Sequence, residues 1–298
     1  MGPSRRAFAC VLAVVGVIFA GVLASCEPAG HAPVRAALKL PLPKNKVVHG
    51  QFVTRRMTVP RGYGSAGRPF YLESRTRTAA PEPLMLLLHG LYQTPAEVEK
   101  ATGAAAYSEQ QHFTLVYPIG EHRAWDAGYC CRHDSANDLG YLVDLVHYVS
   151  TLTPIDLHRV YIVGFSNGGM MAWRAVCQTH GVFAGAGVMA GALLVKCPQI
   201  VHVVDLHGLR DRTVPYAGGW SAYTHTFMPD SATERRALVP GSTLQVVLLK
   251  RLGHAWPPLR GNFDALNVIW QGLRSYRVAH PAPPAQLAQT STEGPVEG

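Results

Sequence analysis

The chain lacks the spacings and charge runs that mark several common classes of protein. It contains no Cys-x-x-Cys and no His-x-x-x-His spacing, so it offers no familiar set of metal ligands. Arg and Lys never occur in runs of four or more, and the net charge of +8 is spread along the chain. Because no basic helix or stripe is visible, we expect no nucleic-acid partner. Charged residues make up 15% of the chain and apolar residues 48%, which indicates a globular rather than a disordered protein.

The first 26 residues have the features of a targeting segment. Arg5-Arg6 form a positive start, residues 7–22 are apolar, and residues 23–26 (Leu-Ala-Ser-Cys) resemble a bacterial lipobox. An ordinary secretory signal and an uncleaved anchor remain alternatives, although about 16 apolar residues are marginal for spanning a bilayer. We therefore expect an extracytoplasmic protein, either secreted or held at the cell envelope by a lipid on Cys26.

Four cysteines remain after such a leader and a lipidated Cys26 are set aside, namely Cys130, Cys131, Cys177 and Cys197. An even number in an oxidising compartment predicts disulfides. A bridge between adjacent residues is strained, which favours two long-range bridges. A bridge between Cys177 and Cys197 is plausible as one of them, but it leaves the adjacent pair without other partners. The sequence leaves this choice open.

Apolar runs alternate with amphipathic stretches between residues 47 and 278. The unbroken run 84–88 suits a central parallel strand that is covered on both faces. This alternation predicts an α/β fold with one doubly wound, mostly parallel sheet and helices on both faces, without a second domain. We expect a Pro-rich tether over 27–46 and a disordered tail over 279–298. Strands are expected at 47–59, 69–75, 84–88, 113–117, 160–163, 184–189, 201–206 and 244–249, and helices from Thr94, over 137–151, after residue 170 and over 263–273.

The most specific local pattern is Gly164-Phe165-Ser166-Asn167-Gly168-Gly169-Met170. It lies between a predicted strand and a predicted helix, as the Gly-x-Ser-x-Gly nucleophile elbow of α/β-hydrolases does. The glycines leave room for a sharp turn that lifts the serine hydroxyl above the sheet. Since the pentapeptide alone also occurs by chance, the interpretation depends on an acid and a base that follow it.

Asp211 and His254 are the candidates for these two roles. In α/β-hydrolases the order along the chain is Ser, then Asp or Glu, then His, and each lies beyond the end of a strand. Asp211 follows the strand predicted over 201–206, whereas the rival Asp205 lies within it. His254 lies between the last predicted strand and the final helix. We interpret His207 as structural support.

An acyl-transfer site also needs backbone N–H donors for the oxyanion. The residue after the nucleophile, Asn167, is expected to supply one of them. The loop that begins at His89-Gly90 is expected to supply the other, at Leu91 or beside it.

These motifs together resemble the polyhydroxybutyrate depolymerase and feruloyl esterase family, which includes LpqC-type bacterial lipoprotein esterases. The resemblance covers about residues 47–278 and implies an extracellular serine esterase with Ser166, Asp211 and His254 as its triad. The motifs that carry it are His89-Gly90, Trp125 with Cys130-Cys131, the elbow, Asp211 with Val214-Pro215-Tyr216 and Gly218-Gly219, and Gly253-His254-Ala255-Trp256-Pro257.

Three features depart from that family. Two adjacent aspartates are usual before the helix that precedes the elbow strand, whereas this chain has Asn137-Asp138. Leu91-Tyr92 is bulkier than the usual Gly- or Cys-rich loop, which suggests a smaller or more aromatic acyl pocket. The chain has no room for an added polymer-binding domain, which counts against efficient attack on a solid polyester.

The leading hypothesis is therefore a carboxylic ester hydrolase that acts on short-chain, hydroxyalkanoate or aromatic (feruloyl) esters. Trp125, Tyr216 and Trp256 are candidates to line its pocket, with core packing as the alternative for each. We expect no metal or organic cofactor, a small or oligomeric ester as substrate, and a monomer. The alternatives are an acyltransferase on envelope lipids or glycans and a surface lipoprotein that only binds.

Overall fold

The computed structural model describes residues 46–49, 52–76, 80–131, 136–221, 223–231, 236, 238–259 and 263–282, all within the unit Ala36–Gly298. The predicted leader, Cys26, residues 27–45 of the tether and residues 283–298 of the tail lie outside them. Residues 279–282 of the predicted tail are described, and the Ala282 N–H donates to Gly181 O over 2.9 Å. No helix in the described ranges has the length and apolar character needed to cross a bilayer.

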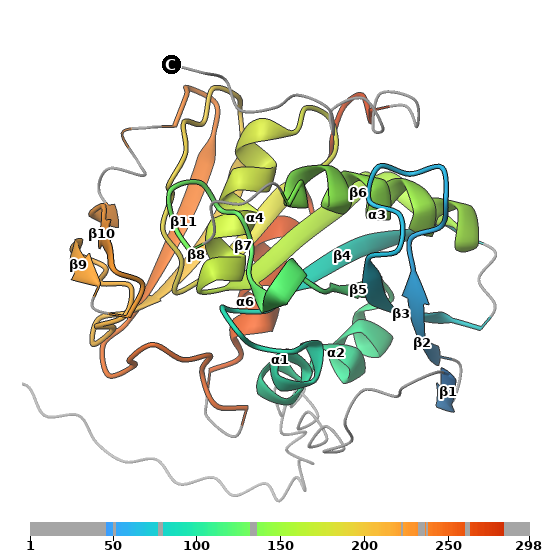
Figure 1. Ribbon diagram of the computed structural model, residues 1–298, viewed down its shortest axis with the longest axis horizontal. Helices are drawn as coiled ribbons and strands as arrows, with labels where there is room; N and C mark the ends of the chain where they lie inside the picture. Colours follow the sequence, from blue (N-terminus) through green and yellow to red (C-terminus); the bar gives the residue numbers. More distant parts are fainter. Residues whose placement is uncertain are drawn as a thin grey trace, which may run out of the picture. The chain divides into compact units, whose positions relative to one another are not determined.

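Among the described residues, nine strands form one sheet in the order β1-β2-β3-β5-β4-β6-β7-β8-β11 (Figure 1). The first three strands pair antiparallel, and β3 pairs antiparallel with β5. From β5 to β11 all neighbours are parallel, as the apolar runs predict. The strands are β1 Lys46–His49, β2 Phe52–Thr58, β3 Pro69–Arg75, β4 Glu82–Leu88, β5 Thr114–Pro118, β6 Ile155–Phe165, β7 Gly185–Met189, β8 His202–Gly208 and β11 Thr243–Leu249.

Helices cover both faces of this sheet, which confirms the predicted doubly wound α/β class (Figure 1). On one face α3 and α4 pack over the larger core, which contains Leu86, Ile162 and Trp173. On the other face α6, together with residues of α1 and α2, packs over a second core with Leu87, Val163 and Trp270. These helices are α1 Pro95–Thr102, α2 Ala104–Gln111, α3 Asp138–Leu152, α4 Asn167–Gln178 and α6 Ala265–Leu273.

The start of α1 shows how the sequence places an element. Thr94 Oγ1 accepts a hydrogen bond from the Glu97 N–H at 3.3 Å, and Glu97 Oε2 accepts one from the Thr94 N–H at 2.7 Å. Pro95 occupies the first helical turn, where its missing N–H is not needed. The predicted capping box is therefore confirmed.

The structure differs from the sequence-based elements in three places. The single strand expected over 47–59 is two antiparallel strands, β1 and β2. Helix α2 was not expected, because its Ala- and Gln-rich sequence has no pronounced apolar face. A hairpin formed by β9 (Gly219–Ser221) and β10 (Thr226–Met228) was also missed; its two strands are only three residues long.

The disulfide pairing includes the bridge between adjacent cysteines that its strain made the less favoured choice. Cys177 at the end of α4 bonds to Cys197, with 4.5 Å between their Cα atoms. Cys130 bonds to its neighbour Cys131. The preference for two long-range bridges is therefore wrong. Two disulfides fit a chain that works in an oxidising compartment.

A buried carboxyl group on β3 makes stability depend on pH. Burial, together with the negative charges of Glu99 and Glu109, raises the pKa of Glu73 to about 8. Between about pH 4.5 and about pH 8 the folded chain thus holds a proton at Glu73 that the unfolded chain releases. Stability should fall through this window as pH rises, by roughly 1.4 kcal/mol per pH unit at most.

The Glu73→Gln variant should lose this dependence and gain stability over the wild type between pH 5 and pH 8. Denaturant unfolding at several pH values measures the difference. A matched control is Glu121→Gln, since Glu121 is exposed. If stability changes with pH by the same slope in the wild type and in Glu73→Gln, the raised pKa of Glu73 is not the cause of the dependence.

Candidate active site

Ser166 lies at the sharp turn between β6 and α4. Its φ of 54° is in the left-handed region that residues with a side chain rarely adopt. The glycines around it permit the turn: a Cβ atom on Gly164 would lie 2.1 Å from Gly168 O, and one on Gly168 would lie 2.4 Å from His89 O. The sequence-based explanation of these glycines as steric requirements agrees with these distances.

The structure brings Ser166, His254 and Asp211 into one hydrogen-bonded row. His254 Nε2 lies 2.8 Å from Ser166 Oγ, and His254 Nδ1 lies 2.7 Å from Asp211 Oδ2. A carboxylate can only accept, so the Nδ1 proton points to Asp211 and Nε2 is free to accept the serine proton. The Asp211 side chain is fully buried, while that of His254 is 19% exposed. This row can transfer a proton from Ser166 to His254.

Backbone groups fix Asp211 in this row. Its Oδ1 accepts hydrogen bonds from the N–H groups of Thr213 at 2.9 Å and Val214 at 2.8 Å. His207 Nε2 donates to Val214 O at 2.7 Å and so supports the same loop, as expected of a structural histidine. The rival Asp205 is buried within β8, where it pairs in register with Val188 and Val246. The structure therefore places Asp211, and not Asp205, at His254.

The loop after β4 leaves one N–H group available near the elbow. The Gly90 N–H donates to Gln93 Oε1 at 2.9 Å, and the Tyr92 N–H donates to Arg123 O at 2.7 Å. The intervening Leu91 N–H has no acceptor among the described residues, and the Asn167 N–H at the start of α4 has none there either. These are the two donors that the sequence singled out, and Gln93 is the residue that sequence reasoning missed.

His89 holds this loop as a neutral side chain. Burial lowers the pKa of His89 to about 4, so the imidazole carries a single N–H at neutral pH. Its Nδ1 donates to Gly90 O at 2.8 Å, and its Nε2 accepts from the Gly120 N–H at 3.0 Å. A neutral ring satisfies both bonds at once, whereas a protonated ring would not.

The three aromatic pocket candidates differ in their surroundings. Trp125 is fully buried, its ring lies 4.9 Å from that of His89, and its Nε1 donates to His89 O at 2.8 Å. Trp125 therefore has the core-packing position that the sequence left open as the alternative to lining the pocket. Tyr216 and Trp256 are half-buried; Tyr216 lies edge-on against His207, and Trp256 packs beside the second core.

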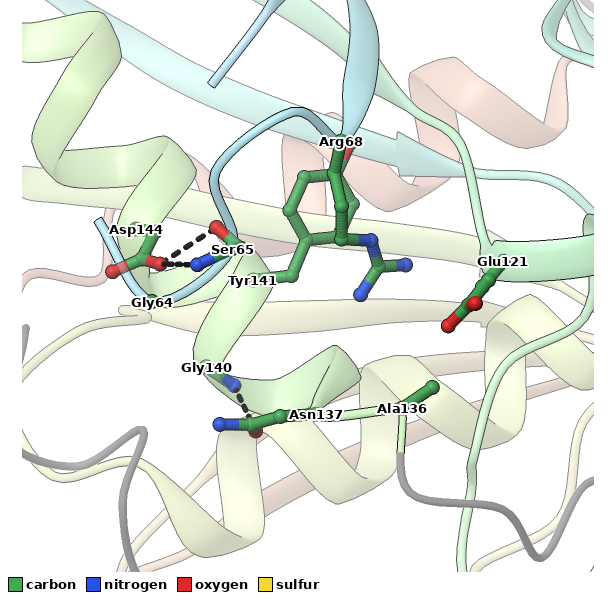
Figure 2. A pocket seen from close by; sticks show the side chains of 9 residues that line it. All are labelled: Gly64, Ser65, Arg68, Glu121, Ala136, Asn137, Gly140, Tyr141 and Asp144. Carbon is green, nitrogen blue, oxygen red and sulfur yellow. Dashed lines mark hydrogen bonds between the residues drawn. The ribbon is translucent and has the colours of Figure 1, made fainter. Parts of the chain in front are cut away.

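Two hollows in the described part of the chain contain no residue of the triad. A cavity of about 200 Å³ lies at the start of α3, where Arg68 lies over the Tyr141 ring and Ser65 donates twice to Asp144 (Figure 2). A more open pocket of about 400 Å³ lies at the loop that carries His254. It is lined by Leu249, Lys250, Arg251, Leu252, Pro257 and Phe263.

The sequence matches the model of a known family and resembles several known proteins. The family described as esterase PHB depolymerase matches residues 70–223, just over half of the chain. The protein described as "putative esterase NocK" of Nocardia uniformis subsp. tsuyamanensis is 28% identical over 207 residues. These cover 64% of this chain and 58% of NocK. The poly(3-hydroxybutyrate) depolymerase of Ralstonia pickettii is 31% identical over 121 residues, or 36% of this chain and 25% of that enzyme. The matches thus span less than two thirds of either relative.

Solved structures agree on the fold. The S-formylglutathione hydrolase of Agrobacterium tumefaciens superposes with a TM-score of 0.56 at 12% identity, over 77% of this chain and 98% of the other. At that identity the likeness concerns the α/β-hydrolase fold alone. Together with the match over residues 70–223, the elbow and the row from Ser166 to Asp211 place this chain in the esterase PHB depolymerase family.

Proposed function

We propose that this chain is a serine carboxylic ester hydrolase that works through an acyl-enzyme. The observation that carries the proposal is the position of His254 between Ser166 Oγ, at 2.8 Å, and Asp211 Oδ2, at 2.7 Å. A serine hydroxyl is a poor nucleophile at neutral pH, and a base held in its working tautomer is what activates it. Membership of an esterase family supports the same reaction.

The steps follow from these positions. Ser166 Oγ bonds to the ester carbonyl carbon while its proton passes to His254 Nε2. The N–H groups of Leu91 and Asn167 stabilise the resulting oxyanion. The bond from that carbon to the alcohol oxygen then breaks, and His254 returns the proton to the leaving alcohol. Water repeats the sequence on the acyl-enzyme, releasing the acid, while Asp211 stays ionised throughout.

The substrate proposed is a small or oligomeric ester whose acyl part is a short chain, a hydroxyalkanoate or an aromatic acid. Tyr216 and Trp256 are the remaining candidates to contact it, since both are partly exposed on the two loops that carry the triad acid and base. We propose that the protein acts as a monomer outside the cytoplasm, attached to the membrane through a lipid on Cys26. The two disulfides support the compartment, and the lipobox-like residues 23–26 support the anchor.

One experiment separates this proposal from its alternatives. The soluble domain and its Ser166→Ala variant are treated with a fluorophosphonate probe and assayed with nitrophenyl esters, with and without an added alcohol. We expect labelling and hydrolysis by the wild type only. Labelling with more transfer to the alcohol than to water would indicate an acyltransferase instead. The absence of both labelling and turnover would leave a binding protein and refute the proposal.

A further inference from the structure

Trp125 contacts both chain segments that carry the proposed oxyanion donors. Its indole Nε1 donates to His89 O at 2.8 Å, two residues before Leu91. Its backbone forms a pair of bonds with the Asn167 side chain: the Trp125 N–H donates to Asn167 Oδ1 at 2.8 Å, and Asn167 Nδ2 donates to Trp125 O at 2.9 Å. Both residues are almost completely buried, so water does not compete for these bonds. Trp125 thus links the loop after β4 to the first residue of α4.

The residue after Trp125 is held from two helices. The Asp126 N–H donates to Asp138 Oδ2 at 2.7 Å at the start of α3. Arg174 of α4 donates to Asp126 O at 2.7 Å and lies 2.9 Å from Asp126 Oδ2. Arg68 in turn donates to the other oxygen of Asp138 at 2.6 Å. The segment that carries Trp125 is therefore fixed to the packed core rather than left as a free loop.

We propose that Trp125 and the Asn167 side chain act as a clamp that sets the positions of the Leu91 and Asn167 N–H groups. Oxyanion donors work only when they lie at hydrogen-bond distance from the place where the charge develops. The two donors come from segments that are 76 residues apart in the sequence, and Trp125 bonds to both segments. Both are positioning residues for the reaction under "Proposed function", on which this inference rests.

The test measures the oxyanion site separately from folding. Asn167→Ala keeps the backbone N–H but removes both bonds to Trp125, and Trp125→Phe removes the bond to His89. We expect kcat for a nitrophenyl ester to fall about 10- to 100-fold in Asn167→Ala, less than the roughly 10²- to 10³-fold loss when a donor is removed outright. In Trp125→Phe kcat should fall less, and KM should change little in both variants. Titration with a fluorophosphonate gives the concentration of active sites. Because kcat is then calculated per active site, misfolded protein does not lower it.

A trifluoromethyl ketone supplies the second readout, because its hemiketal oxyanion occupies the same site. Its inhibition constant should rise by the same factor as kcat/KM falls, while that of a non-hydrolysed amide analogue stays constant. The matched control is Trp173→Phe, since Trp173 is equally buried and its Nε1 has no partner in the described part of the chain. It should lose stability but keep its kcat.

The outcomes separate the clamp from the proposed function. If active sites titrate normally and both clamp variants keep the wild-type kcat and ketone inhibition, the clamp is refuted and the esterase stands. A loss of kcat in Trp173→Phe that matches Trp125→Phe would also refute it, because general packing would then explain the effect. If the wild type shows neither titration nor turnover, the proposed function itself fails.

Discussion

Replacing Asp211 with asparagine is expected to lower kcat for ester hydrolysis by about 10⁴-fold while the chain remains folded. Asp211 Oδ1 accepts two backbone N–H groups, so the amide oxygen of the variant should stay on that side. The amide NH₂ then faces His254 Nδ1, which can only accept from it. The imidazole proton is forced onto Nε2, and the histidine can no longer accept the proton of Ser166.

Kinetics at pH 7, with unfolding curves to verify folding, measure this effect. Asp205→Asn is the matched control, because Asp205 is also buried and lies on β8, the strand that precedes the Asp211 loop, but it does not contact His254 in the row described above. Its kcat per active site should stay within a few-fold of the wild type. A large loss in Asp205→Asn together with near-normal Asp211→Asn would overturn the assignment of the acid.

Replacing Gly168 with alanine is expected to damage both stability and catalysis. The new Cβ atom would lie 2.4 Å from His89 O and 2.8 Å from Leu88 O, and backbone oxygens cannot move aside as a flexible side chain can. Overpacking of this kind costs roughly 1–3 kcal/mol. Relief of these close contacts would push the end of β4 away from the elbow. The Leu91 N–H should then move as well, and kcat should fall.

Gly169→Ala is the control for this prediction. A Cβ atom there would meet Gly164 O at 3.1 Å and Val188 Cγ1 at 3.2 Å, contacts that small shifts can relieve. Thermal unfolding and kcat of the two variants, measured side by side, give the comparison. Equal stability and equal activity in the two variants would show that the close approach of Gly168 to β4 is unimportant.

Much of the fold was predictable because its signals are local. The apolar run 84–88 appears as the central strand β4, and the Thr94–Glu97 capping box begins α1 as expected. The order of Ser166, Asp211 and His254, each beyond a predicted strand, is enough to predict one site from the sequence. That works because the carboxyl ends of parallel strands meet at one edge of the sheet.

Other features depend on contacts between distant segments and left no local signal. The burial of Trp125 follows from its bonds to His89 and Asn167, which no spacing reveals. The bridge between Cys177, near the end of α4, and Cys197 joins two segments whose approach depends on the fold, so the sequence could not decide the disulfide pairing. Gln93 could have been found by one cue: it lies three residues after Gly90, where a turn brings its side chain back to the Gly90 N–H.

The most direct test of the acyl-enzyme mechanism is to find the acyl group on Ser166. The wild type is mixed with an excess of a nitrophenyl ester, quenched in acid within the first turnovers, digested and analysed by mass spectrometry. We expect the mass of the acyl group on the peptide that contains Ser166, together with a burst of nitrophenol. Turnover with the acyl group on a different residue, or with the Ser166 peptide unmodified and no burst, would contradict the mechanism.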